Sequence, residues 1–132
     1  MKKTAFLIVA TIAILSFSCE EDNVNIRSLK GNWVEASSQT DTLVFNDNKS
    51  EGMFFLNRGR ELRGGHMLPK INSGPYDYEI VNDSIVLRWG LSSCMCTESY
   101  EFNVLPDEDK LKVGNFYNKD IPLGLILIFE KL

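Results

Sequence analysis

From residue 30 onward, apolar and polar residues alternate in short runs that turn residues separate. Successive side chains of a strand point to opposite faces, so this period of two is typical of strands with one buried face. No segment after the N-terminal apolar run, that is after residue 18, shows a helical period with capping residues at its ends. The pattern predicts about eight strands, over residues 31–37, 40–46, 51–57, 76–81, 85–89, 100–104, 110–117 and 123–129. Residues 58–74, rich in Gly and Arg, are expected to form a long loop.

These strands predict an all-β fold. Asn82-Asp83, between two of them, is typical of a tight hairpin turn. Sheets made of sequential hairpins leave unpaired edges, which closure removes, so we expect an antiparallel barrel of about eight strands. A β-sandwich is the alternative that fits the same periodicity. A barrel of eight short strands has a narrow interior, filled by side chains or holding one small ligand, and a large cavity is not expected.

Four short motifs resemble the small lipocalin-like (calycin-type) lipoproteins of Bacteroidota: LKGNWVEA at 29–36, DTLVFNDN at 41–48, YDYEIVNDSIVLRW at 76–89 and DEDKLKV at 107–113. The first contains a Gly-x-Trp signature similar to that of lipocalins. The resemblance implies a lipocalin-like β-barrel over residues 29–132, with Trp33 on the first strand plugging the closed end. Lipocalins pack an Arg or Lys from near the last strand over this Trp, and Lys131 is the nearest candidate. Their helix before the last strand is not expected, because NKDIPLG at 118–124 is too short.

The N-terminus carries Lys2 and Lys3, then an apolar run over residues 5–17 that stops at Ser18-Cys19. This run has the length of a signal-peptide core and is shorter than the roughly 20 residues of a membrane-spanning helix. The segment resembles a bacterial lipoprotein signal peptide, although Ser16 stands where that family's lipobox usually has Leu. The resemblance implies cleavage after residue 18 and lipidation of Cys19 with acyl chains such as palmitate, which would anchor the protein to a membrane. The alternative is an ordinary secretory signal cut near Ser18, with Cys19 incidental.

Three acids, at positions 20–22, follow the predicted anchor. They resemble the export signal of surface lipoproteins in Bacteroidota, which implies a surface-exposed protein on the cell outer membrane. The alternative is a solvated spacer at the periplasmic face. Residues 19–28 are thus predicted to be the lipid anchor and an acidic tether.

The net charge limits the possible partners of this protein, and the chain length limits the number of its domains. The chain has 14 basic and 18 acidic side chains, and loss of residues 1–18 would remove two of the basic ones. Such an acidic domain argues against nucleic acid as a partner, since phosphates require compensating Lys and Arg. The remaining 114 residues suffice for one domain with one core.

Cys94 and Cys96 are the most chemically suggestive pair. Outside the cytoplasm paired thiols tend to oxidise, so a local disulfide is expected, although so small a loop stabilises little. The alternatives are a redox-active pair and a soft-metal (copper) site to which His66 and Met67 add ligands. No other cofactor is expected.

The loop over residues 58–74 is a positive island in an acidic domain. Loops over a barrel mouth commonly contact ligands, so an anionic group is a candidate ligand here; the alternative is a mobile, solvated loop. The candidate ligand-binding residues are Trp33, Arg58, Arg60, Arg63, His66 and Trp89. Aromatic side chains of the strands are further candidates for a pocket, although alternating aromatics more often form the core: Phe45, Phe54, Phe55, Tyr76, Tyr78, Trp89, Tyr100, Phe102, Phe116 and Tyr117.

Catalysis is not expected. Any Ser-His-Asp arrangement must use His66, the single histidine, in a Gly-rich segment that is a poor platform for precise geometry. The sequence therefore predicts a binding protein: a carrier of a small apolar or amphipathic ligand, or alternatively a protein-interaction or inhibitor module.

Overall fold

The computed structural model describes residues 26–132. The predicted signal peptide, Cys19 and the tether up to residue 25 lie outside the described residues. Of the predicted tether, Ile26–Ser28 forms a short 3-10 helix, η1, directly before the first strand. Residues 26–132 contain no helix long and apolar enough to cross a membrane.

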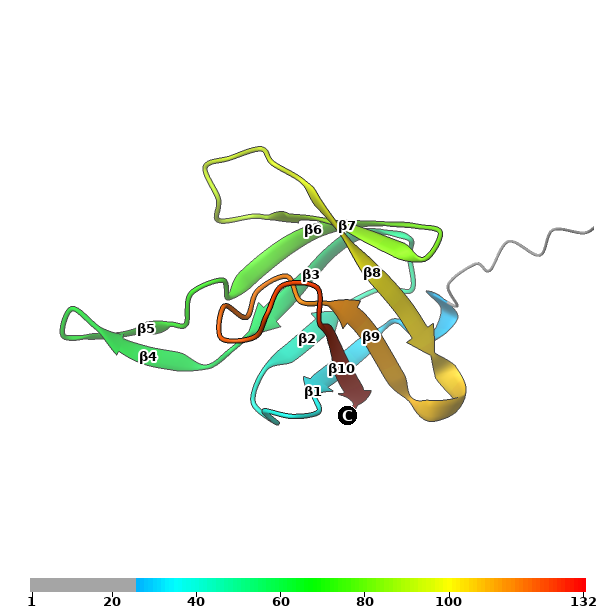
Figure 1. Cartoon of the computed structure of the whole chain (residues 1–132), viewed down its shortest axis with the longest axis horizontal. Coiled ribbons are helices and arrows are strands. Elements are labelled where there is room, and N and C mark those ends of the chain that lie inside the picture. The colour runs from blue at the N-terminus through cyan, green and yellow to red at the C-terminus, as the bar shows by residue number, and fades with distance from the viewer. Residues whose placement is uncertain (1–25) are drawn as a thin grey trace, which may run out of the picture.

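Ten strands make up most of the described chain (Figure 1). They are β1 Gly31–Glu35, β2 Thr42–Phe45, β3 Glu51–Asn57, β4 Arg60–Arg63, β5 His66–Pro69, β6 Gly74–Val81, β7 Ser84–Trp89, β8 Glu98–Leu105, β9 Lys110–Gly114 and β10 Ile126–Lys131. A second 3-10 helix, η2 Pro106–Glu108, joins β8 to β9.

Eight of these strands close into an antiparallel barrel, in the order β1-β10-β9-β8-β7-β6-β3-β2. Each barrel strand pairs with the next barrel strand along the chain, and β1 pairs with β10, where Trp33 lies opposite Lys131. The predicted all-β barrel is therefore confirmed, and the sandwich alternative is excluded. The closed eight-stranded antiparallel barrel is compatible with a lipocalin-like fold.

The barrel interior is filled by side chains from alternating strand positions, as the period of two predicts. On β6 and β7, for example, Tyr76, Tyr78, Ile85 and Leu87 are buried. Aromatic rings of neighbouring strands pack together, with Phe54 and Tyr76 stacked 5.3 Å apart. The inward residues form one cluster: Leu29, Trp33, Leu43, Phe45, Phe54, Leu56, Tyr76, Tyr78, Ile85, Leu87, Phe102, Val104, Leu111, Val113, Tyr117, Leu127 and Phe129.

One end of the barrel is closed around Trp33, which is fully buried. Its indole Nε1 donates a hydrogen bond to the Leu29 carbonyl at 2.8 Å. Lys131 lies over the indole, with Nζ 5.1 Å from the ring centroid, and donates to the Ser28 carbonyl at 2.8 Å. Lys131 thus occupies the position that the lipocalin resemblance implied.

The other end is the mouth, surrounded by four loops: 36–41, 58–73, 90–97 and 115–125. The strand pairing places all four at the end opposite η1 and the chain's C-terminus. The expectation of a long unstructured loop over 58–74 is wrong, because β4 and β5 form a hairpin that projects from the barrel (Figure 1). Gly64 and Gly65 both have positive φ, at 57° and 81°, as a type I′ hairpin turn requires.

Four strands, β1, β2, β9 and β10, end earlier or begin later than the pattern predicted. The Glu35 carboxylate accepts hydrogen bonds from the backbone of Ser37 and Ser38, which turns the chain after β1. The Asn115 side-chain amide donates to the carbonyls of Asn118 and Ile121 at 2.7 and 3.0 Å. These side-chain bonds compete with ladder pairing, so β9 ends at Gly114 and β10 begins only at Ile126.

Candidate functional site

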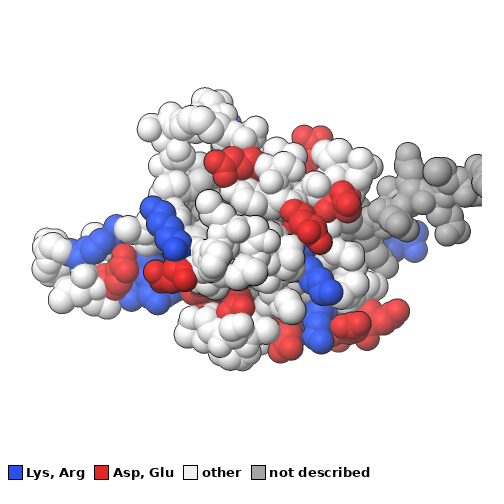
Figure 2. All heavy atoms as spheres, viewed as in Figure 1, with Lys and Arg blue, Asp and Glu red and all other residues white. Residues whose placement is uncertain are grey.

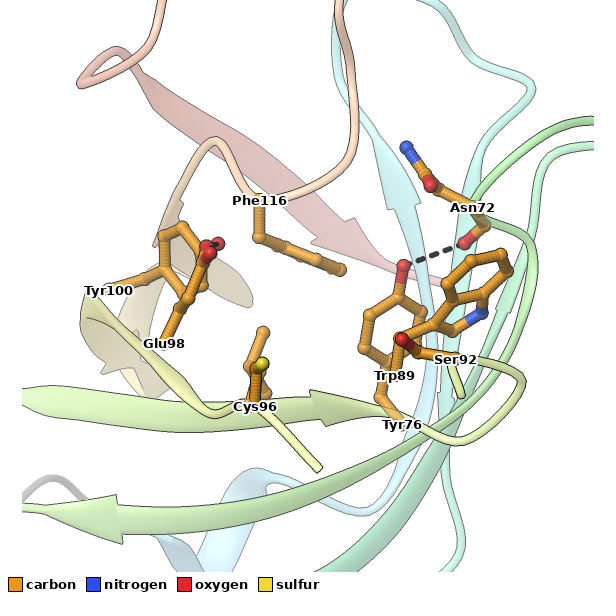
Figure 3. A pocket seen from close by; sticks show the side chains of 9 residues that line it. Asn72, Tyr76, Trp89, Ser92, Cys96, Glu98, Tyr100 and Phe116 are labelled. Carbon is orange, nitrogen blue, oxygen red and sulfur yellow. Dashed lines mark hydrogen bonds between the residues drawn. The ribbon is translucent and has the colours of Figure 1, made fainter. Parts of the chain in front are cut away.

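A cavity of about 180 Å³ lies in the mouth of the barrel (Figure 3). It opens where the inward faces of β6, β7 and β8 meet the loops 58–73, 90–97 and 115–125. Four of its nine lining residues are aromatic; the full lining is Asn72, Tyr76, Leu87, Trp89, Ser92, Cys96, Glu98, Tyr100 and Phe116. Pockets for drug-sized ligands usually measure about 300–1,000 Å³, so this one suits a small group.

The aromatic rings of the cavity are packed against one another. Phe116, in the loop after β9, lies 5.2 Å from Tyr76 in an edge-to-face arrangement and 5.9 Å from Tyr100. Figure 3 shows Tyr100 and Glu98 on one side of the space, Tyr76 and Trp89 on the other, and Phe116 between them. Such contacts between aromatic rings stabilise their packing by more than the burial of apolar surface alone would.

Hydrogen bonds to the backbone fix two of these rings. The Tyr76 hydroxyl donates to the Asn72 carbonyl at 2.7 Å, and Trp89 Nε1 donates to the Ser73 carbonyl at 3.1 Å. Both acceptors belong to the segment between β5 and β6. The cavity wall is thereby tied to the loop that also carries the projecting hairpin.

Glu98, the first residue of β8, is the one charged side chain in the lining. Its carboxylate accepts a hydrogen bond from the Tyr100 hydroxyl. Burial, followed by that hydrogen bond and the Glu98 charge, raises the pKa of Tyr100 well above its ordinary value. Burial likewise raises the pKa of Tyr76, so both phenols stay neutral donors at physiological pH.

A second polar cluster, outside the cavity lining, braces the rim of the mouth. Arg58 forms an ion pair with Asp41, Nε to Oδ2 at 3.3 Å, and both side chains are largely buried. Its guanidinium also donates to the Ile71 carbonyl at 2.9 Å and lies 4.9 Å from the Tyr117 ring centroid. Burial raises the pKa of the Tyr117 hydroxyl, and the nearby Asp41 carboxylate adds to this. Arg58 thus joins three of the four mouth loops.

The structure does not bring the six predicted ligand-binding residues together. Trp89 lines the cavity, whereas Trp33 is fully buried at the opposite end of the barrel. Arg60 and Arg63 lie on the exposed hairpin, where they donate to the carbonyls of Met67 and Pro69, and His66 lies beside its turn. Arg58 lies at the rim of the mouth, where it pairs with Asp41.

Cys94 and Cys96 are joined by a disulfide in the exposed loop between β7 and β8. Their Cα atoms lie 5.1 Å apart, and Cys96 forms part of the cavity wall. Within residues 26–132 no three His, Cys, Asp or Glu side chains form a group that could hold a metal ion, so His66 does not join the two cysteines. The bonded pair agrees with the expectation of a local disulfide.

Glu98, Ser92 and Asn72 were absent from the sequence-based candidates for this site. Tyr76, Tyr100 and Phe116 were named only as aromatic residues of core or pocket. A signal was present, since Trp89 and Tyr100 stand at the mouth ends of two consecutive expected strands. The periodicity could not tell which ends of the strands meet, because that depends on the direction in which the barrel closes.

Two other hollows lie outside the barrel. One, of about 590 Å³, lies on the outer face of β3, β6 and β7 beneath Met95 and Thr97. The other, of about 310 Å³, lies between the base of the hairpin and the loop 115–125, with Arg58, Lys70 and Lys119 set against Glu61 and Asp120. Neither is lined by a ring system like that of the mouth cavity.

Comparison of this chain with family models, with curated proteins and with solved structures found no significant match in any of the three.

Proposed function

We propose that this protein is a lipid-anchored lipoprotein of the bacterial cell envelope, whose lipocalin-like barrel binds a small apolar or amphipathic ligand without turning it over. The observation that carries the binding function is the aromatic cavity in the mouth. The rest of the interior is filled by side chains, so a ligand of any size would have to enter here. A cavity with an apolar wall and a few placed polar groups is the usual form of a small-molecule site.

The position of η1 supports an anchored orientation. Lipidation of Cys19 would place the acyl chains seven residues before Ile26, and so many residues span at most about 25 Å. Since η1 lies at the closed end, the anchor would hold that end near the membrane, and the mouth would face away from it. We place the anchor on the outer membrane with the domain at the cell surface, because of the acids at positions 20–22; the periplasmic face is the alternative.

Native mass spectrometry of the mature protein from envelope membranes tests the binding function. We expect a mass above that of the lipidated chain, lost on denaturation together with a small organic molecule. A Trp89→Ala variant should lose this molecule, whereas Leu123→Ser, at an exposed position outside the cavity lining, should keep it. A bare chain in every preparation would contradict the proposal.

Acyl labelling and surface proteolysis test the anchor separately. Incorporation of labelled fatty acid should require Cys19 and be absent from a Cys19→Ala variant. Protease added to intact cells should cleave the protein if the domain is at the surface. Labelling that persists without Cys19 would rule out lipidation at that residue.

The projecting hairpin favours a second candidate function, a protein-interaction module. Every side chain of β4 and β5 except that of Glu61 is exposed, including Leu62 and Met67, which face each other across the two strands. Figure 2 shows basic side chains on this hairpin, where Arg60 and Arg63 lie. Exposed apolar groups beside Arg are common in interfaces.

Crosslinking in intact envelopes tests this candidate. A specific partner crosslinked to the wild type should be lost with Leu62→Ser combined with Met67→Ser, and kept with the matched Leu123→Ser change. Equal crosslinking of both variants would exclude the hairpin as the interface.

A further inference from the structure

The lining of the mouth cavity presents aromatic rings and hydrogen-bond acceptors, and few free donors. The hydroxyl hydrogens of Tyr76 and Tyr100 and the indole hydrogen of Trp89 are already donated, to Asn72, Glu98 and Ser73 respectively. The Asn72 side-chain amide donates to the Tyr117 carbonyl at 2.8 Å. The Ser92 hydroxyl, which accepts from the Cys94 backbone N–H, is the remaining hydroxyl of the lining. An anionic ligand needs donors, and this wall supplies almost none.

The charge of the cavity lining also disfavours an anionic ligand. Glu98 is exposed and is the only charged side chain of the lining, and no Lys or Arg lines the cavity. The neighbouring loop 90–97 contains no charged residue, and its surface is largely white in Figure 2. The negative potential of Glu98 is therefore not cancelled by a cation within the wall.

Aromatic rings beside a carboxylate can bind an organic cation. The electron-rich faces of Trp, Tyr and Phe attract a positive group, and sites for quaternary ammonium ions use this arrangement. Four rings line this cavity: Tyr76, Trp89, Tyr100 and Phe116. Two of them, Tyr100 and Phe116, contact each other directly beside Glu98 (Figure 3).

We propose that the mouth cavity binds an organic cation of the methylated-ammonium class, with the positive group among the aromatic rings and its charge balanced by Glu98. The cavity volume of about 180 Å³ limits this to a head group of a few heavy atoms, so the rest of an amphipathic ligand would lie outside. This inference rests on the proposed ligand-binding function and names the class of its ligand.

The experiment compares choline with its neutral isostere, 3,3-dimethylbutan-1-ol, in which a carbon replaces the quaternary nitrogen. Both are titrated calorimetrically into the full chain in non-ionic detergent. We expect choline to bind about tenfold more tightly, which corresponds to about 1.4 kcal/mol. The shape of the two probes is nearly the same, so the difference reports the charge.

Two matched variants assign the effect to the cavity. Glu98→Gln should weaken choline binding about fivefold, the upper range for an exposed ion pair, and leave the isostere unchanged. Glu101→Gln removes the same charge from an exposed position of the same strand, outside the lining, and should change neither affinity. Circular dichroism of each variant confirms that the barrel is intact.

The outcomes separate the inference from the function on which it rests. Equal binding of both probes, or tighter binding of the isostere, overturns the cation proposal and leaves the ligand-binding function standing. A loss with Glu101→Gln equal to that with Glu98→Gln also overturns it, because the effect is then one of net charge. Binding of neither probe at millimolar concentration overturns the cation proposal and counts against the mouth as a site for molecules of this size.

Discussion

The two tryptophans of this domain occupy opposite ends of the barrel and differ in what surrounds them. Trp33 is fully buried, hydrogen-bonded to Leu29 and covered by Lys131. Trp89 makes the same type of bond, to the Ser73 carbonyl, yet stays partly exposed beside a cavity. The closed end is thus filled by a large side chain of its own, whereas the mouth has aromatic walls around a space. Burial stabilises the closed end, whereas the mouth gives up part of that burial and keeps a cavity, which we propose is the ligand site.

Truncation of each tryptophan gives the largest expected difference between the ends. We expect Trp33→Ala to lower the free energy of unfolding by about 3–5 kcal/mol, as for other fully buried aromatic residues. Trp89→Ala should cost about half as much, because part of its surface is already in contact with water. Denaturant unfolding followed by far-ultraviolet circular dichroism measures both. Equal losses would mean that the mouth is packed as tightly as the closed end.

Variants of the Arg58–Asp41 ion pair test how much this pair contributes to stability at the rim of the mouth. Arg58→Met leaves the buried Asp41 carboxylate without its cation and should cost about 3 kcal/mol, as for other broken buried ion pairs. Changing Asp41→Asn as well removes the unpaired charge, so the double variant should be more stable than Arg58→Met alone by about 1 kcal/mol. A double variant no more stable than the single one would show that Arg58 acts through packing on Tyr117 and not through charge.

Glu35 predicts a pH-dependent contribution from the loop between β1 and β2. Burial alone would raise its pKa, but the backbone N–H groups of Ser38 and Ser37 outweigh burial, and the pKa is lowered below its ordinary value of 4.5. A lowered folded-state pKa means that the stabilisation is present at neutral pH and is lost as the pH falls through the folded-state pKa. Glu35→Gln should therefore cost about 1 kcal/mol at pH 7 and progressively less in acid. A pH-independent difference from the wild type would contradict this assignment.

The hairpin should show the smallest effect on global stability. Gly65→Val places a β-branched residue at φ 81° and should unfold β4 and β5 locally, but change the free energy of barrel unfolding by less than about 0.5 kcal/mol. In β9, a side chain at Gly114 would meet the Tyr100 Cβ at 3.3 Å, so Gly114→Val should cost about 1–3 kcal/mol. Hydrogen exchange reports the local event and denaturant unfolding the global one. A large global loss with Gly65→Val would show that the hairpin folds together with the barrel.

Several features of the hairpin and the mouth were predictable only in part. Gly64-Gly65 is a known signal for a type I′ turn, yet the flanking residues lack the alternating apolar pattern of a half-buried strand, because both faces of the hairpin are exposed. The ends of β1 and β9 were misplaced because the side chains of Glu35 and Asn115 bond to nearby backbone groups. Such local bonds carry no periodic signature.

The sequence by itself determined the all-β class and the eight barrel strands, since a period of two in apolar residues is a local property that does not depend on how the strands are arranged. Through the family resemblance it also indicated Trp33 and Lys131 as partners. Only the tertiary structure decided that the barrel closes between β1 and β10, which loops share the mouth, and that Trp89, Glu98, Tyr100 and Phe116 surround one cavity. These residues come from three separate segments, and their meeting depends on strand direction and closure, which no local pattern encodes.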